Sequence, residues 1–228
     1  MNFSEFLKNN FKRRFVINLE KRKDRYIEFL NRIPFDADVC ERFLAVDGKY
    51  LKHRIKDNPY IMGCHMSHKN ILRKVIEDQT VSDNDLILIF EDDVFFNNSF
   101  KNDLINIVPI VKKIDPNFIL YIGGRFTENF KPSSLNEWEY VDFKLYNKKG
   151  NHTTIKSLDH DRTTHAIILT KFACKEIINK TKDVSSSIAI DFLYQNIRNY
   201  VPNIKIYDVF SHLCYSPMNY KSDIQTKM

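Results

Sequence analysis

The stretch "RFVINLEKRKDRYIEFLNRIPFDADVCERFLAVDG", residues 14–48, decides the fold class. It opens with the apolar, β-branched run 14–19, which predicts a buried strand. Residues 24–33 then place their apolar side chains on one helical face, with Asp24 as the expected N-cap. A second short strand follows before a turn. Strand, helix and strand within about 30 residues form the βαβ unit of a parallel sheet.

The same alternation continues along the chain, and no linker or internal repeat interrupts it. We therefore expect a single α/β domain. Residues 127–160 are less regular, which is typical of a substrate loop. The other expected strands are 85–90, 118–124, 164–170 and 203–210. Four further helices are expected. The first begins near Ser67, the second spans 102–114 with an interruption near Pro109, the third spans 171–181, and the fourth lies within 187–200.

Length and composition fit one globular domain. The chain has 228 residues, of which 43% are hydrophobic and 28% charged, so it can bury a sizeable core. The formal net charge of +6 comes from 35 Lys and Arg against 29 Asp and Glu, which are spread along the sequence. Such dispersed charge fits an anionic small molecule as well as nucleic acid, and we expect no nucleic-acid partner.

Cysteine usage and the N-terminal sequence predict a location. The four cysteines form no C-x-x-C pair, which favours free, mostly buried thiols in a reducing compartment. The first 15 residues lack the apolar region of a signal peptide, and no apolar run approaches the roughly 20 residues of a membrane helix. The sequence therefore predicts a cytoplasmic protein with no membrane span.

A run of three acids ends the predicted strand in "LILIFEDDVFF", residues 86–96. Adjacent buried carboxylates cost several kcal/mol unless something compensates them. Glu91, Asp92 and Asp93 suit a hard divalent cation such as Mg²⁺ or Mn²⁺. The alternative interpretation is a solvated turn whose acids cap a helix. Asn18 also follows a predicted strand, and the carboxyl ends of the strands in an open α/β sheet share one ligand-binding edge.

Two further sets of side chains could bind ligands. Arg22 and Arg25 follow the first strand and could clamp a phosphate, although they also fit a solvated run of charges. Cys64, His65 and His68 could indicate zinc, but without a distant partner cluster we expect Ser67 to cap a helix and His68 to make a polar contact. No P-loop and no G-x-S-x-G elbow is present.

Seven motifs in order give a resemblance to a known family. They are "FVINLEKRKDR", "AVDGK", "MGCHMSHKNIL", "ILIFEDDVFF", "THAIILTKFACKEII", "AIDFL" and "SDIQ". From about residue 15 to residue 225 the chain resembles the family 25 glycosyltransferases. The resemblance implies a GT-A type fold, which is a Rossmann-like, mainly parallel sheet flanked by helices that binds a nucleotide-sugar. It implies a nucleotide-sugar-binding half at about 14–125 and an acceptor side at about 126–228.

The resemblance also implies roles for individual residues. In "EDD", Asp93 would meet the metal, Asp92 the ribose, and Glu91 would support the loop. The remaining donor-site residues are those of the first-strand motif, the turn after the second strand and the "GC-x-x-SH" block. They are Asn18, Leu19, Arg22 and Arg25, then Asp47 and Gly48, then Ser67 and His68.

Family 25 enzymes are inverting, so the resemblance implies a base that takes the proton of an acceptor hydroxyl. Asp191 in "AIDFL" is our candidate base, and its alternative role is an N-cap. His212 is a candidate second metal contact. The implied reaction moves galactose or glucose from a UDP-sugar, with Mn²⁺ or Mg²⁺, to a hydroxyl of a glycan, a lipopolysaccharide or a hydroxylysine-type acceptor. The alternative is a non-catalytic nucleotide-sugar or glycan-binding module on the same fold.

Overall fold

The core of the molecule is a six-stranded sheet with the order β2-β1-β3-β7-β5-β8. The computed structural model describes residues 2–51, 58–113, 116–126, 163–209 and 213–217. Five strands run parallel, and β7 is antiparallel to both of its neighbours, β3 and β5. The predicted mainly parallel sheet is confirmed. The strands are β1 (Phe11–Asn18), β2 (Glu41–Leu44), β3 (Leu86–Glu91), β5 (Phe118–Tyr121), β7 (Ala166–Thr170) and β8 (Lys205–Asp208).

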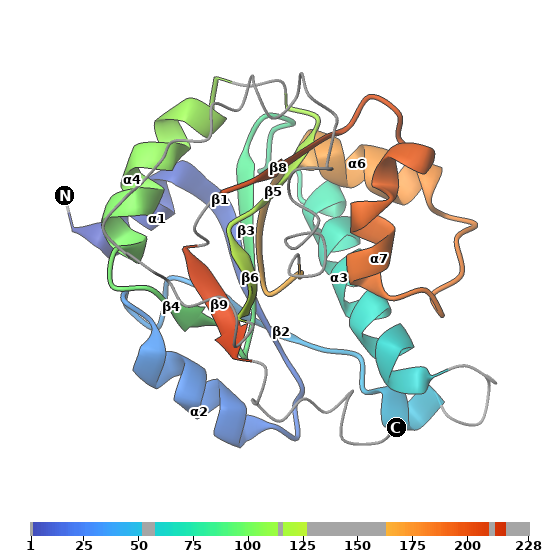
Figure 1. Ribbon diagram of the computed structural model, residues 1–228, viewed down its shortest axis with the longest axis horizontal. Helices are drawn as coiled ribbons and strands as arrows, with labels where there is room; N and C mark the ends of the chain where they lie inside the picture. The colour runs from blue at the N-terminus through green and yellow to red at the C-terminus, as the bar shows by residue number, and fades with distance from the viewer. Residues whose placement is uncertain (1, 52–57, 114–115, 127–162, 210–212, 218–228) are drawn as a thin grey trace.

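Helices cover both faces of this sheet (Figure 1). On one face lie α1 (Phe3–Asn10), α2 (Lys23–Arg32) and α4 (Phe100–Val111), and on the other lie α3 (Pro59–Glu77), α6 (Lys171–Lys180) and α7 (Ile190–Gln195). The short 3-10 helices η1 (Gly48–Leu51) and η3 (Ile197–Asn199) follow β2 and α7. The predicted arrangement of helices around one central sheet is therefore confirmed.

The apolar run of β3 is explained by burial on both sides. Leu86, Leu88 and Phe90 pack into the core beneath α1, α2 and α4. Ile87 and Ile89 pack into the opposite core, beneath α3, α6 and α7. Because successive side chains of a strand point to opposite faces, a strand between two helical layers must be apolar at every position.

A second, three-stranded sheet has the order β4-β9-β6. It consists of β4 (Phe95–Phe96), β6 (Gly123–Phe126) and β9 (Cys214–Pro217). The predicted strand 118–124 is thus two strands, β5 and β6, with one residue between them. A Cβ on Gly123 would lie 2.9 Å from the Cβ of Ala166, so the close approach of β6 to β7 requires glycine there.

Several predicted helix starts and ends are wrong. The N-cap of α2 is Arg22, and Asp24 lies inside the first turn. Helix α3 begins at Pro59, capped by the side chain of Asn58, so Ser67 lies in its interior rather than at its start. Helix α4 continues through Pro109 to Val111. The irregular stretch 127–160, predicted to be a substrate loop, lies outside the described residues.

Candidate functional site

The acidic turn that follows β3 is buried and carries its own counter-charge. Asp92 and Asp93 are only 6% and 8% exposed. Arg25 of α2 pairs with both, because its Nη2 lies 2.6 Å from Oδ1 of Asp92 and 3.3 Å from Oδ2 of Asp93. One guanidinium thus compensates two carboxylates, which the interpretation as a solvated turn does not explain.

Asn18, at the end of β1, holds the turn from the other side. Its Nδ2 donates to Oδ2 of Asp92 at 2.5 Å, and its Oδ1 accepts from Nε of Arg42 at 3.0 Å. Arg32 of α2 donates to the backbone carbonyl of Asp92 at 2.7 Å. Burial raises the pKa of Asp92 to about 7, although the charge of Arg25 opposes this. Both side-chain oxygens of Asp92 have partners within the protein, because Arg25 pairs with Oδ1 and Asn18 donates to Oδ2.

Glu91 connects β3 to two other elements. Its Oε1 lies 3.1 Å from Nε2 of His68 in α3 and accepts from Oγ1 of Thr164 at 2.6 Å. Its backbone N–H donates to the carbonyl of His165, just before β7, at 2.9 Å. Burial raises the pKa of Glu91, but the hydrogen bond from His68 and the charge of His165 outweigh burial and hold this pKa well below its usual range.

One group of ligand atoms suits a divalent cation. Glu91, Asp93 and His165 each offer one such atom, and these atoms lie within 4.8 Å of one another. Oδ1 of Asp93 and Nδ1 of His165 are buried and have no hydrogen-bond partner among the described residues. Buried polar atoms without partners are costly, and a bound cation would satisfy them. The residues present therefore fit the predicted metal.

A second group shares Glu91 and adds Cys64 and His68 of α3. Sulfur and imidazole ligands favour a softer ion such as zinc, whereas carboxylates favour Mg²⁺ or Mn²⁺. Oε1 of Glu91 already has partners in His68 and Thr164. The group with Asp93 and His165 is therefore the better site for the hard cation.

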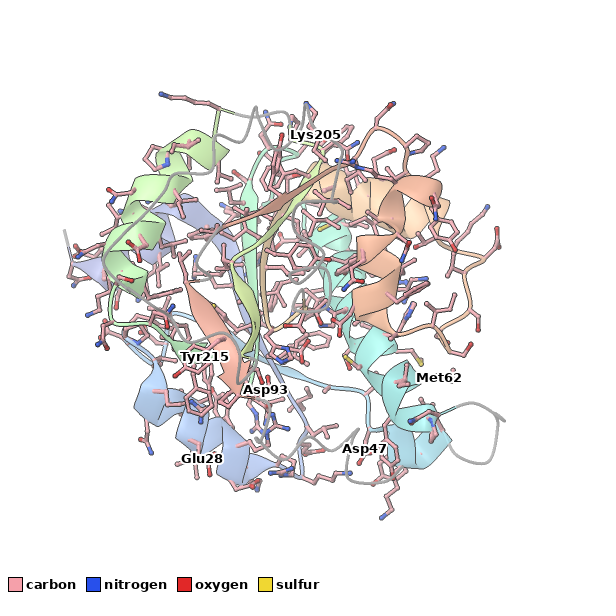
Figure 2. All side chains as sticks on the ribbon, viewed as in Figure 1. Glu28, Asp47, Met62, Asp93, Lys205 and Tyr215 are labelled. Atoms are coloured by element: carbon pink, nitrogen blue, oxygen red, sulfur yellow. The ribbon has the colours of Figure 1, made fainter. Side chains whose placement is uncertain are left out.

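A cleft with an empty volume of ≈ 620 Å³, part of it open to solvent, lies beside the acidic turn. Figure 2 shows Asp93 at the lower end of the central sheet and Asp47 farther out, toward η1. The cleft is lined by Ile17, Asn18, Leu19, Arg25, Ala45, Val46, Gly48, Tyr60, Cys64, Ser67, Glu91, Asp92 and Asp93.

Close packing of α3 against the chain after β2 forms one wall of this cleft. A Cβ on Gly48 would lie 2.3 Å from the carbonyl oxygen of Pro59, and one on Gly63 would lie 2.5 Å from that of Val46. Oγ of Ser67 accepts from the N–H of Val46 at 2.8 Å and donates to the carbonyl of Gly63 at 2.6 Å. Ser67 thus fastens the wall and does not cap the helix.

Two predicted donor-site residues make other contacts. Arg22 pairs with Asp24, at 2.9 Å between Nη2 and Oδ2. Asp47 pairs with Lys21, at 2.7 Å between Oδ2 and Nζ. Neither of these two residues lines the cleft, and the predicted donor-site residue His68 does not line it either. A phosphate clamp formed by Arg22 and Arg25 stays a prediction.

Asp191 lies in the first turn of α7 and reaches the acidic turn through one intermediate residue. Its Oδ1 accepts from the backbone N–H of Thr164 at 2.9 Å and lies 2.7 Å from Oγ1 of the same residue. The N-cap of α7 is Ala189, so the N-cap alternative for Asp191 is wrong. His212, the candidate second metal contact, lies outside the described residues.

Sequence reasoning missed His165 and Thr164. They are the first two residues of the predicted strand 164–170, whereas ligands are expected where parallel strands end. Because β7 is antiparallel to β3, its start lies at the edge where the parallel strands end. The only signal was the polar run "TTH" before an apolar strand, which the pattern alone does not assign to either edge.

Ligands of open α/β sheets bind at the edge where the parallel strands end, and the cleft lies at that edge. The chain belongs to glycosyltransferase family 25, because the model of that family, described as an LPS biosynthesis protein family, matches residues 11–194. No described helix is both long enough and apolar enough to cross a membrane.

Three curated relatives are named procollagen galactosyltransferases. Procollagen galactosyltransferase 2 of Mus musculus is 29% identical over 139 residues, which cover 52% of this chain and 21% of the relative. Procollagen galactosyltransferase 1 of Danio rerio is 29% identical over 145 residues, covering 55% and 23%. Procollagen galactosyltransferase 2 of Homo sapiens is 28% identical over 139 residues, covering 52% and 21%. The matched stretch thus spans about a fifth of each relative's length.

Proposed function

We propose that the chain is an inverting, metal-dependent glycosyltransferase that moves a hexose from a UDP-sugar to an acceptor hydroxyl. The hexose is galactose or glucose, and the acceptor is a glycan, a lipopolysaccharide or a hydroxylysine-type side chain. One observation carries the proposal: Glu91 and Asp93 line the cleft and also form, with His165, a group whose ligand atoms suit a cation. Membership of family 25 supports sugar transfer, and the names of the relatives make galactose the first donor to test.

Glu91, Asp93 and His165 are the proposed ligands of the cation. A bound divalent cation supplies positive charge that stabilises a departing diphosphate. Two carboxylates with one imidazole favour Mn²⁺ over Mg²⁺, since Mg²⁺ prefers oxygen ligands alone. Asp92 is not among the proposed cation ligands. Because Arg25 and Asn18 already contact its two side-chain oxygens, its proposed role is to hold the turn in place.

The donor is proposed to occupy the cleft, against Asn18, Leu19 and Gly48. Gly48 lets η1 approach α3 so closely that any side chain there would overlap the backbone of Pro59. Arg25 lines the same cleft and carries the charge that suits a phosphate.

Asp191 is the proposed general base. Only Oδ1 of Asp191 accepts hydrogen bonds from the described residues, so Oδ2 is the oxygen available to an acceptor. In the step, the acceptor oxygen forms a bond to the anomeric carbon of the donor sugar. The bond from that carbon to the diphosphate oxygen breaks, and its electron pair leaves with the UDP. The hydroxyl proton passes to Asp191.

A donor screen tests the proposal. The purified chain is incubated with a panel of UDP- and GDP-hexoses, with Mn²⁺ or with EDTA, and released nucleotide is measured. We expect turnover with a UDP-hexose that EDTA abolishes and Mn²⁺ restores. Asp93→Asn should lower the rate about 100-fold or more, because it weakens both the cation site and the leaving-group stabilisation.

Asp103→Asn is the matched control, because Asp103 is a buried acid of α4 that does not line the cleft. Its turnover should stay within about 3-fold of the wild type. Full activity of Asp93→Asn with Mn²⁺ present would show that the metal role is wrong. UDP binding by calorimetry without turnover of any donor would favour the non-catalytic binding module instead.

A further inference from the structure

Thr164 joins the candidate base to the candidate cation site. It is 1% exposed and lies two residues before β7. Its backbone N–H donates to Oδ1 of Asp191 at 2.9 Å, and its Oγ1 lies 2.7 Å from the same oxygen. The same Oγ1 lies 2.6 Å from Oε1 of Glu91. One residue therefore contacts both the first turn of α7 and the end of β3.

A threonine hydroxyl has a single proton, so it donates to only one of two acceptors at a time. The hydroxyl of Thr164 therefore donates either to Glu91 or to Asp191. The backbone N–H of Thr164 donates to Oδ1 of Asp191 whichever acceptor the hydroxyl has, so it keeps this oxygen in place. Anything that makes Glu91 a poorer acceptor turns the hydroxyl toward Asp191.

We propose that Thr164 is a positioning residue that holds Asp191 in its reactive orientation and couples Asp191 to cation binding at Glu91. This inference rests on the proposed function, in which Asp191 is the base and Glu91 a metal ligand. The Oε2 atom of Glu91 faces His165, at 3.7 Å from its Nδ1, whereas the hydroxyl of Thr164 contacts Oε1. A cation on Oε2 would withdraw negative charge from the carboxylate and make Oε1 a poorer acceptor for that hydroxyl. The hydroxyl then donates to Asp191 and strengthens its hold, so the base becomes fixed when the donor's cation is in place.

The neighbouring residue shows that a buried hydroxyl here is not bonded by default. Thr163 is 3% exposed, and its Oγ1 has no hydrogen-bond partner among the described residues. The two threonines thus have the same chemistry and similar burial, but only Thr164 contacts two carboxylates. Thr163 provides the matched control for a test of Thr164.

The test compares Thr164→Val, Thr164→Ser and Thr163→Val in the full chain. Valine keeps the shape of threonine and removes the hydroxyl, whereas serine keeps the hydroxyl. We expect Thr164→Val to lower kcat about 10- to 100-fold, with the donor KM within about 3-fold of the wild type, because a misplaced catalytic group costs rate rather than donor binding. Thr164→Ser and Thr163→Val should keep kcat within about 3-fold.

A double-mutant cycle separates positioning from a structural role. Because Thr164 acts through Asp191, Thr164→Val should change kcat little in an Asp191→Asn background. The Mn²⁺ dissociation constant, followed by electron paramagnetic resonance of free Mn²⁺, gives a readout besides activity. Asp191→Asn should shift that constant in the wild-type background and shift it at least about 3-fold less in the Thr164→Val background.

Three results would overturn the inference while leaving the proposed function intact. They are a kcat of Thr164→Val equal to that of Thr163→Val, a kcat of Thr164→Ser as low as that of Thr164→Val, and additive effects with Asp191→Asn on both kcat and Mn²⁺ affinity. A wild-type chain that neither binds Mn²⁺ nor turns over a donor would instead refute the proposed function, and the inference with it. If Thr164→Val does not fold, Thr164→Ala takes its place in every comparison.

Discussion

Arg25→Gln removes the positive charge that pairs with Asp92 and Asp93 but keeps a side chain that can donate a hydrogen bond. The side chains of the three residues are only 9%, 9% and 11% exposed. Removing one partner of a buried ion pair leaves an uncompensated charge and typically costs about 3–5 kcal/mol. Whole domains have free energies of unfolding of about 5–15 kcal/mol, so this variant should be markedly less stable in the absence of a cation.

A divalent cation should recover part of that loss. Any ligand at about 100 times its dissociation constant stabilises the folded protein by about 2.7 kcal/mol. In Arg25→Gln the cation also relieves the repulsion between the carboxylates, so Mn²⁺ should stabilise the variant by more than it stabilises the wild type. Urea unfolding with EDTA and with Mn²⁺ measures both gains as free energies of unfolding.

Arg73→Gln is the control, because Arg73 is exposed on α3 and donates to Asn70 at 3.0 Å. It should cost less than about 1 kcal/mol with or without Mn²⁺. A loss below about 1 kcal/mol for Arg25→Gln in EDTA would refute the argument that Arg25 compensates the acids. An equal gain from Mn²⁺ in variant and wild type would show that the cation does not share carboxylates with Arg25.

Gly63→Ala should lower the free energy of unfolding by about 1–3 kcal/mol and weaken UDP binding, because the new Cβ would lie 2.5 Å from the carbonyl oxygen of Val46. An unchanged melting temperature and unchanged UDP binding by calorimetry would contradict the close packing of α3 against the chain after β2. Hydrogen bonds from Thr80 and then Arg13 lower the pKa of Asp78 from 3.8 to about 2, so its stabilisation is present above pH 3.8 and is lost as the pH falls through 2. The difference in free energy of unfolding between wild type and Asp78→Asn should therefore shrink as the pH falls from about 4 to 2 in urea titrations. A difference that persists in full at pH 2 would show that the stabilisation does not come from the ionised carboxylate of Asp78. Cys64 lines the cleft, whereas the other three cysteines are buried. Iodoacetamide should therefore label Cys64 first, and UDP should slow that labelling, which peptide mass spectrometry measures. Labelling that UDP does not affect would show that the nucleotide binds elsewhere.

The central strands were predictable because their physics is local. β3 is apolar over residues 86–90 and β1 over residues 15–17, and only a strand covered on both faces needs such a run. The acids after β3 were predictable as a site for the same reason, since a buried strand that ends in carboxylates requires a counter-charge. Sequence did not reveal that Arg25 supplies this charge, because the pairing depends on how α2 packs against the turn.

The start of α3 was missed although its signal is present. Asn58 and Pro59 are an N-cap followed by proline at the first helical position, which is a typical helix start. The predicted start near Ser67 lies eight residues after Pro59. In the structure, Gly63 and Ser67 are helical because both face Val46, a tertiary contact that no local propensity encodes.

The position of His165 could not be predicted because it depends on strand direction. The pattern of "THAIILT" indicates a buried strand equally well whether it runs parallel or antiparallel. Only pairing with β3 and β5 brings the start of this strand, with His165, to the edge where Glu91 lies. Non-local pairing therefore decides which side chains enter the site.

The place of β7 in the sheet also has a consequence for biosynthesis. β3 and β5 do not pair with each other, because β7 lies between them and bonds to both. A nascent chain that has emerged only as far as residue 125 has made β3 and β5 but leaves both with an open edge until Ala166–Thr170 follows. Open, apolar strand edges invite aggregation, so the ribosome-bound chain should depend on chaperones until that late strand is added.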